Sequence, residues 1–240
     1  MNLPYPNLQA AIIDLDGTLV DTLGDFEVAL NRALADVDLP LADRTLVEHS
    51  VGKGSEHLIR TVLAHQLALT VTQGQGPLCQ GRSVDNLYAP AWLRYQHHYL
   101  AINGQFATVY PGVVQGLQML QDQGLQLACL TNKPLSFAKP LLQAKGLDRF
   151  FSHVFGGDSF ARKKPDPLPL LKTCEALGTL PAQTLMVGDS SNDAQAARAA
   201  ACPVALVRYG YNHGLPIDAV DADAHVDALT ELAQALAKSA

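Results

Sequence analysis

One stretch near the N-terminus, IIDLDGTLVDT at residues 12–22, decides the fold. The apolar run that leads into it predicts a buried strand over residues 10–14, yet this run ends in two aspartates only two positions apart. Burying one carboxylate costs free energy, and a second carboxylate beside it costs more. We therefore expect other parts of the chain to supply compensating positive charge near Asp14 and Asp16.

Short apolar runs alternate with longer helical patterns over much of the remaining chain. The predicted strands are 10–14, 125–131, 153–155, 184–188 and 204–207, and the predicted helices are 113–123, 136–145, 168–177 and 193–201. This alternation predicts an α/β fold, a Rossmann-like parallel sheet sandwiched by helices.

Residues 22–104 interrupt the alternation. Apolar residues recur there at helical spacing, for example at Phe26, Leu30 and Leu34, and a second helical pattern covers 87–99. The segment VTQGQGPLCQGRSVDN between these patterns is polar and Gly-rich, which predicts a mobile loop. We predict a small helical domain at 22–104, inserted into a core made of residues 1–21 and 105–240.

The composition is typical of a cytoplasmic globular protein. Hydrophobic residues make up 48% of the chain, the formal net charge is −6, and no basic run is present, so nucleic acid is not an expected partner. No apolar run reaches the roughly 20 residues of a membrane span, and the N-terminus does not have the pattern of a signal peptide. No pattern bears on the oligomeric state. Scattered cysteines without a C-x-x-C pair indicate a reducing compartment; they are Cys79, Cys129, Cys174 and Cys202.

Polar residues follow the predicted central strands directly. In an open parallel sheet, ligands bind at the carboxyl ends of the strands, so these residues are expected to share one crevice. They are Asp14 and Asp16 after the first strand, Thr131, Asn132 and Lys133 after the second, Asp189 to Asp193 after the fourth, and Lys163 and Lys164 in the loop before the fourth.

Asp14, Asp16, Asp189 and Asp193 would bring four carboxylates into this crevice. Two carboxylates about 4 Å apart repel each other by about 4 kcal/mol at an effective dielectric constant of 20. Such a cluster requires a cation, and an all-oxygen ligand set favours a hard ion such as Mg²⁺. Taken alone, the segments could be turns or helix caps, since Ser, Asn and Asp often cap helices. Their joint occurrence at strand ends favours a functional site.

The four stretches resemble the four motifs of the haloacid dehalogenase superfamily of phosphotransferases. The matching residues are Asp14-x-Asp16-Gly17-Thr18, Thr131, Lys164 before Pro165, and Gly188-Asp189-x-x-x-Asp193. Further stretches are similar to bacterial phosphoglycolate phosphatases, namely those at residues 110–112, 131–134, 156–158, 163–167 and 209–212. In such proteins an inserted helical cap domain occupies the place of residues 22–104.

The resemblance implies Mg²⁺-dependent hydrolysis of a small phosphate monoester through an aspartyl-phosphate. Asp14 is the implied nucleophile and Asp16 the implied acid and base, and an acid at this second position favours phosphate esters over haloacids. The resemblance further implies that Thr131 and the Asn132 amide bind the phosphoryl group and that Lys164 neutralises charge. The implied metal ligands are Asp14, the Asp16 carbonyl and Asp189. Asp193 is implied either as a further ligand or as a residue that contacts the ligands. Lys163 is adjacent to Lys164, but the family's lysine directly precedes the proline.

The implied substrate, a small phosphorylated metabolite, is 2-phosphoglycolate. The alternatives are a phosphatase of a sugar phosphate or of pyrophosphate, a β-phosphoglucomutase-like phosphotransferase, and a binding module without catalysis. In the cap, Gly52 and Lys53 lie in a stretch similar to the loop that contacts the substrate, where Lys53 either meets a substrate carboxylate or is solvated. The chain departs from the family at Ala201, where a glycine usually ends the helix, and this change is expected to affect stability more than chemistry.

Overall fold

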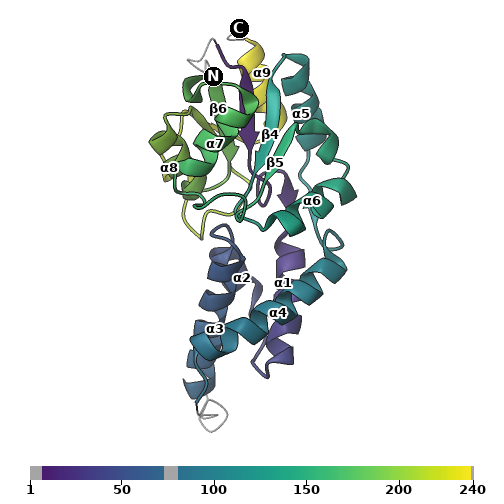
Figure 1. Ribbon diagram of the computed structural model, residues 1–240, viewed down its shortest axis with the longest axis vertical. Helices are drawn as coiled ribbons and strands as arrows, with labels where there is room; N and C mark the ends of the chain where they lie inside the picture. Colours follow the sequence, from purple (N-terminus) through teal and green to yellow (C-terminus); the bar gives the residue numbers. More distant parts are fainter. Residues whose placement is uncertain (1–6, 73–80, 239–240) are drawn as a thin grey trace.

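The computed structural model describes residues 7–72 and 81–238, so Cys79 and half of the predicted loop lie outside the described residues. The main sheet is parallel throughout and its strand order is β5-β4-β1-β6-β7-β8 (Figure 1). The α/β fold is thus confirmed. The strands are β1 (Ala10–Ile13), β4 (Gln126–Leu130), β5 (His153–Phe155), β6 (Thr184–Gly188), β7 (Val204–Val207) and β8 (Ala224–Val226).

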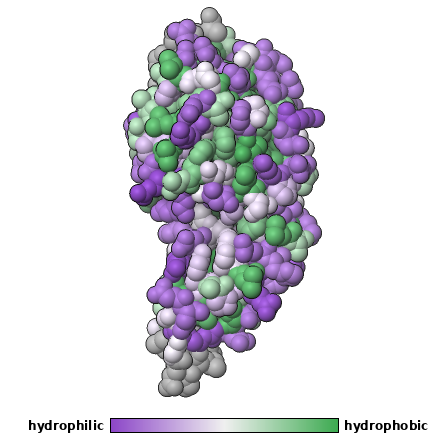
Figure 2. Space-filling model, in the orientation of Figure 1, coloured by the Kyte–Doolittle hydropathy of each residue, from purple (hydrophilic) through white to green (hydrophobic). Residues whose placement is uncertain are grey.

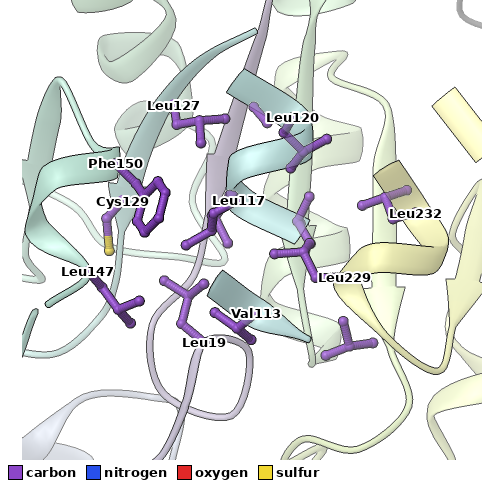
Figure 3. Close-up of a cluster of buried hydrophobic side chains, with 14 of the residues drawn as sticks. Leu19, Val113, Leu117, Leu120, Leu127, Cys129, Leu147, Phe150, Leu229 and Leu232 are labelled. Carbon is purple, nitrogen blue, oxygen red and sulfur yellow. The ribbon is translucent and has the colours of Figure 1, made fainter. Parts of the chain in front are cut away.

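Helices cover both faces of this sheet because successive strand residues point to opposite sides. In β1, Ala11 and Ile13 pack into one cluster and Ala10 and Ile12 into the other. The first face is covered by α5 (Val113–Asp122), α6 (Leu135–Ala144) and α9 (Leu229–Ala237), and the second by α7 (Leu168–Leu177) and α8 (Ser191–Ala200). Figure 3 shows the first cluster, in which leucines of α5 meet those of α9 and the side chains of β4.

The segment from Leu23 to Ile102 is largely helical and has an apolar core of its own. Its helices lie beyond the end of the sheet, and the molecule narrows between the two parts (Figures 1 and 2). Two core residues, Phe137 and Tyr211, also pack into this second cluster. The predicted domain limits, 22 and 104, stay a prediction. The helices are α1 (Leu23–Asp36), α2 (Arg44–Ser50), α3 (Ser55–Thr72) and α4 (Val84–Ile102).

The two connections between these parts run side by side as a short antiparallel ribbon of β2 (Val20–Asp21) and β3 (Thr108–Val109). Asp25 lies buried beside the ribbon, and its carboxylate accepts hydrogen bonds from the backbone N–H groups of Gly104 (2.6 Å) and Phe106 (2.7 Å). The start of α1 is thereby bound to the chain that returns from α4. Among the described residues, no helix combines the length and apolar character required to cross a membrane.

Candidate active site

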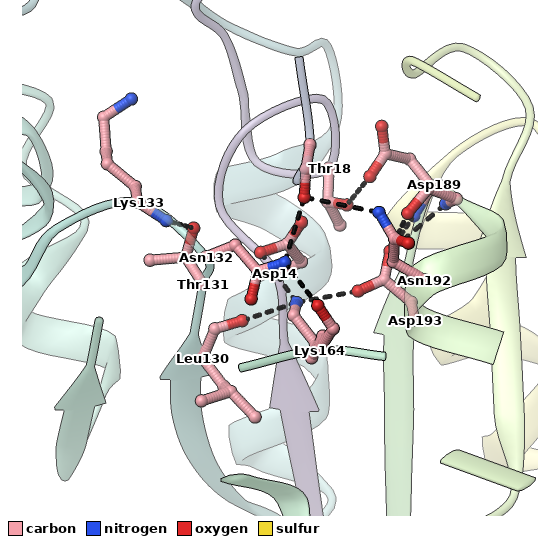
Figure 4. A network of polar contacts seen from close by, with 12 residues as sticks. Asp14, Thr18, Leu130, Thr131, Asn132, Lys133, Lys164, Asp189, Asn192 and Asp193 are labelled. Carbon is pink, nitrogen blue, oxygen red and sulfur yellow. Dashed lines mark hydrogen bonds and ion pairs between the residues drawn. The ribbon is translucent and has the colours of Figure 1, made fainter. Parts of the chain in front are cut away.

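The predicted site residues from the strand ends meet at one edge of the sheet, where β1 lies between β4 and β6 (Figure 4). The backbone N–H of Asp14 donates to Val187 O (2.9 Å), which continues the sheet bonding just past the end of β1. Thr131 is held in the same way by Phe155 O (3.1 Å). The ladder itself thus fixes the positions of both residues, and their side chains are almost fully buried.

Lys164 is the central cation of this group. Its Nζ lies 3.0 Å from Asp14 Oδ1 and 2.7 Å from Asp193 Oδ1, and it donates to Leu130 O (2.9 Å). Burial opposes the charge, but the two carboxylates outweigh it and hold the pKa of Lys164 above its usual range. Lys163, in contrast, is exposed. This placement favours Lys164 as the family's lysine, as the sequence comparison implied.

Three buried carboxylates, those of Asp14, Asp189 and Asp193, have oxygen atoms within 4.8 Å of one another. The pKa of Asp14 is raised to about 7, because burial and the charges of Asp193 and Asp16 outweigh the lowering effect of Lys164. Burial and the neighbouring charges of Asp193 and Asp14 also raise the pKa of Asp189 well above its usual range. A divalent cation would relieve this crowding, so the oxygen donors present fit Mg²⁺.

Both carboxylate oxygens of Asp193 already bind groups of the protein. Oδ1 binds Lys164, whereas Oδ2 accepts from the Ser190 hydroxyl (2.7 Å) and from the N–H groups of Ser190 (3.2 Å) and Asp189 (3.3 Å). Ser190 is the N-cap of α8, which begins at Ser191 rather than near Asp193. These bonds favour the alternative in which Asp193 orients the loop and Lys164 instead of binding the metal directly.

Asp189 is fixed by groups whose role the sequence did not indicate. Its Oδ2 accepts from the Tyr211 N–H (2.6 Å) and its Oδ1 from the Thr18 hydroxyl (3.2 Å). Gly17 has φ +82°, and a Cβ at this position would lie 2.0 Å from Asp189 Oδ2. Glycine is therefore required after Asp16 both for the left-handed backbone and for the close approach of Asp189.

Asp16 interacts with Lys133, a residue that the sequence places at the end of a central strand but for which it indicates no role. Its Oδ1 accepts from Thr22 Oγ1 (2.7 Å) and from Lys133 Nζ (2.7 Å), and the Lys133 side chain is only 1% exposed. The ammonium also lies 4.1 Å from the ring centroid of Phe26 in α1. The only indication in the sequence was the position of Lys133 directly after Thr131 and Asn132, since an isolated lysine is more often exposed.

A cavity opens over these residues between the sheet edge and the helical segment. Its wall on the helical side contains Gly52, Gly54, Ser55 and apolar side chains, and its floor contains Asp14, Asp16, Thr131, Asn132 and Lys133. Of the two predicted cap residues, Gly52 lines this cavity. Lys53 is exposed and lines a neighbouring groove with His57, Arg60 and Lys163.

Asn132 connects the cavity floor to the helical side. Its side-chain amide donates to Gly52 O (3.0 Å) and to Lys164 O (2.8 Å), and Asn192 Nδ2 also donates to Gly52 O (3.3 Å). The Asn132 side-chain donors are therefore already used within the protein. The backbone N–H of Asn132, rather than its side-chain amide, is therefore the donor suited to bind a phosphoryl oxygen.

Comparisons with known proteins agree with this geometry. The phosphoglycolate phosphatase of Thiobacillus denitrificans is 39% identical over 99% of this chain and 99% of its own length. A plasmid-encoded phosphoglycolate phosphatase of Cupriavidus necator is 43% identical over 93% of this chain and 90% of its own. The crystal structure of a predicted phosphoglycolate phosphatase from Haemophilus somnus superposes with a TM-score of 0.86 at 32% identity, covering 95% of this chain and 97% of that one. The family model for haloacid dehalogenase-like hydrolases matches residues 8–201. The chain belongs to the haloacid dehalogenase-like hydrolases.

Proposed function

We propose that this chain is a Mg²⁺-dependent phosphatase that hydrolyses 2-phosphoglycolate to glycolate and phosphate. The observation that carries the proposal is the buried group in which Lys164 joins Asp14 to Asp193, with Asp16 two residues further along and facing the same cavity. The names of the relatives support the choice of 2-phosphoglycolate among phosphate esters.

In the first step, a carboxylate oxygen of Asp14 attacks phosphorus and the bond from phosphorus to the ester oxygen breaks. Asp16, in its acid form, gives its proton to the departing alkoxide, so that glycolate leaves with a hydroxyl group. Lys164 offsets the negative charge that Asp14 and the phosphoryl group bring together. Thr131 and the Asn132 N–H are positioned on the cavity floor to hold phosphoryl oxygens.

In the second step, water hydrolyses the aspartyl-phosphate. Asp16, now a carboxylate, takes a proton from the attacking water, and the bond from phosphorus to the Asp14 oxygen breaks. Inorganic phosphate leaves and the Asp14 carboxylate is restored. One acid therefore serves both steps, which requires a carboxyl group within reach of the leaving oxygen and of the water that replaces it.

The metal would be held by Asp14, the backbone carbonyl of Asp16 and Asp189. When bound, Mg²⁺ supplies charge neutralisation and orients the phosphoryl group. Asp193 and Tyr211 hold the surrounding groups in place through the hydrogen bonds described above. We further propose that the protein acts in the cytoplasm, which is supported by the unpaired state of its three described cysteines.

The proposal is tested by measuring phosphate release from a panel of monoesters with and without Mg²⁺, beside the Asp14→Asn variant. We expect 2-phosphoglycolate to lead the panel and Asp14→Asn to be inactive on every substrate. A sugar phosphate or pyrophosphate at the head of the panel would keep the chemistry but change the substrate. Conversion of a sugar 1-phosphate to its 6-phosphate without phosphate release would identify a mutase instead. Activity retained by Asp14→Asn would contradict the mechanism.

A further inference from the structure

We propose that Lys133, with Tyr99 packed against it, forms a second anion subsite that binds the carboxylate of a short phosphorylated hydroxy acid. This inference rests on the proposed function and names the part of the chain that recognises the acid end of the substrate. The subsite lies beside Asp16, on the side of the cavity that faces α1 and α4.

Lys133 is a buried cation on the floor of the substrate cavity. Its ammonium is 2.7 Å from Asp16 Oδ1, 4.1 Å from the ring centroid of Phe26 and 4.8 Å from that of Tyr99. Asp16 is the single carboxylate with which it forms an ion pair in the described part of the chain. The two aromatic rings leave the ammonium short of hydrogen-bond acceptors, although it can donate three hydrogen bonds. A second anion would meet donors that are already in place.

A phenol group beside Lys133 also lacks a partner. Tyr99 is fully buried, its ring centroid lies 4.8 Å from the Lys133 ammonium, and among the residues that the structure describes its hydroxyl has no hydrogen-bond partner. Burial raises the pKa of this phenol well above its usual range, so the hydroxyl stays protonated and can donate. An unpaired buried hydroxyl costs about 1–3 kcal/mol, so such a donor beside a lysine indicates an acceptor-rich ligand.

The covalent structure of a two-carbon acid fits this position. In 2-phosphoglycolate the carboxylate carbon is two bonds from the ester oxygen, which must lie within hydrogen-bond reach of Asp16 during proton transfer. The carboxylate therefore falls next to the groups that surround Asp16, and the nearest cation there is Lys133.

The wall of the cavity on the helical side limits the length of the substrate. The apolar side chains of Phe26, Val51 and Leu58 line the cavity on the helical side, and Ser55 supplies a hydroxyl there. Such a wall leaves the several hydroxyl groups of a sugar without partners, which disfavours sugar phosphates. Lys53 is an unsuitable carboxylate ligand in this conformation because it is exposed in the neighbouring groove.

The test compares 2-phosphoglycolate with ethyl phosphate, which has the same two-carbon length but no carboxylate. For wild type we expect a preference for the acid, measured as a ratio of kcat/KM values. In Lys133→Met, whose side chain is of similar length but uncharged, this ratio is expected to fall by about 30-fold. Tyr99→Phe removes one hydroxyl and is expected to lower the ratio by about 5-fold. Lys53→Met is the matched control and should keep the wild-type ratio.

A second readout separates this subsite from the proposed function. Glycolate is expected to raise the melting temperature of the wild type and of Lys53→Met, but not that of Lys133→Met. Equal losses on both esters in Lys133→Met and Tyr99→Phe, with glycolate binding retained, would overturn the subsite and leave Lys133 as a positioning residue for Asp16. The opposite outcome has two parts: the wild type binds glycolate but releases no phosphate from 2-phosphoglycolate, and Lys133→Met no longer binds glycolate. That outcome would uphold the subsite and overturn the proposed function.

Discussion

Lys164 and Asp193 form an ion pair of 2.7 Å in the interior, where neither side chain is more than 2% exposed. The same ammonium lies 3.0 Å from Asp14 Oδ1, so one cation joins the proposed nucleophile to the first turn of α8. Removing one member of a buried ion pair leaves an uncompensated charge, and this usually costs more than the pair contributes. The position of Asp14 therefore depends on a loop residue that is 150 positions away in the sequence.

We expect Lys164→Met to lose activity and stability together. Phosphate release should fall by about 100-fold or more, because the charge on Asp14 and the phosphoryl group loses its neutralising partner. The free energy of unfolding should fall by about 3–5 kcal/mol, because two buried carboxylates lose their cation. Steady-state kinetics and urea unfolding measure these two effects. Lys163→Met, one position earlier and exposed, is the control and should change both quantities little; an equal loss there would contradict the assignment of the lysine.

The carboxylate cluster predicts an unusual dependence of stability on pH in the metal-free protein. The pKa of Asp14 is raised to about 7 in the folded state, whereas the unfolded chain has the ordinary value near 4. Between these values the folded state binds more protons than the unfolded state, so stability should fall as the pH rises through this window. The pKa of Asp189 is raised as well and acts in the same direction.

Comparison with Asp14→Asn isolates this contribution. In EDTA, the wild type should lose stability relative to Asp14→Asn as the pH rises from 5 to 7. The difference between their free energies of unfolding should change by at most about 1.4 kcal/mol per pH unit. Added Mg²⁺ should reduce the pH dependence of the wild type, because a bound cation stabilises the ionised carboxylates. Urea unfolding at several pH values measures the difference. A difference that stays constant with pH would show that Asp14 does not titrate in this range.

Much of the fold and of the site could be predicted because its signals are local. The apolar runs that precede Asp14, Thr131 and Asp189 are short and end in polar residues, and the carboxyl ends of neighbouring parallel strands meet at one edge. Strand β8 was not predicted, since it has only three residues and His225 lies in its centre. The predicted strands at 10–14 and 125–131 were too long at their ends: β1 ends at Ile13, and β4 runs from Gln126 to Leu130.

Contacts that depend on tertiary structure could not be predicted. The sequence places Lys133 at a strand end, but it does not indicate that Phe26 and Tyr99 pack over this lysine and make it a buried cation. Tyr211 belongs to a stretch that is similar to the family, but its N–H reaches Asp189 through a loop whose course the sequence does not indicate.

The departure from the family at Ala201 makes a stability prediction. Ala201 ends α8 with φ +59°, a left-handed conformation that costs a residue with a Cβ about 1–2 kcal/mol. Ala201→Gly should therefore raise the free energy of unfolding by about 1 kcal/mol, after the greater entropy of glycine in the unfolded chain is subtracted. Phosphate release should not change. Ala200→Gly, one residue earlier and within the helix, is the control and should have the opposite sign, a loss of about 1 kcal/mol. If both glycine variants changed the free energy of unfolding in the same direction, backbone conformation at residue 201 would be excluded as the cause.

Asp25 makes the last prediction, because it binds the two connections between the core and the helical segment to each other. Its buried carboxylate accepts from the N–H groups of Gly104 and Phe106, and no cation in the described part of the chain forms an ion pair with it. Asp25→Ala should lower the free energy of unfolding by about 3 kcal/mol, since two buried N–H groups lose a charged acceptor. It should also increase hydrogen exchange of the backbone amides at 104 and 106.

The matched control is Glu27→Gln in the same helix, whose carboxylate pairs with the exposed Arg44. A surface pair of this kind contributes about 0–1 kcal/mol, so its loss should leave exchange at residues 104 and 106 unchanged. Urea unfolding and hydrogen exchange read by mass spectrometry distinguish two causes of the loss of stability in Asp25→Ala. Faster exchange confined to the ribbon would mean that Asp25 holds the two connections together, whereas faster exchange throughout α1 would mean that the helix itself depends on this residue. No change at the ribbon would contradict the role assigned to Asp25.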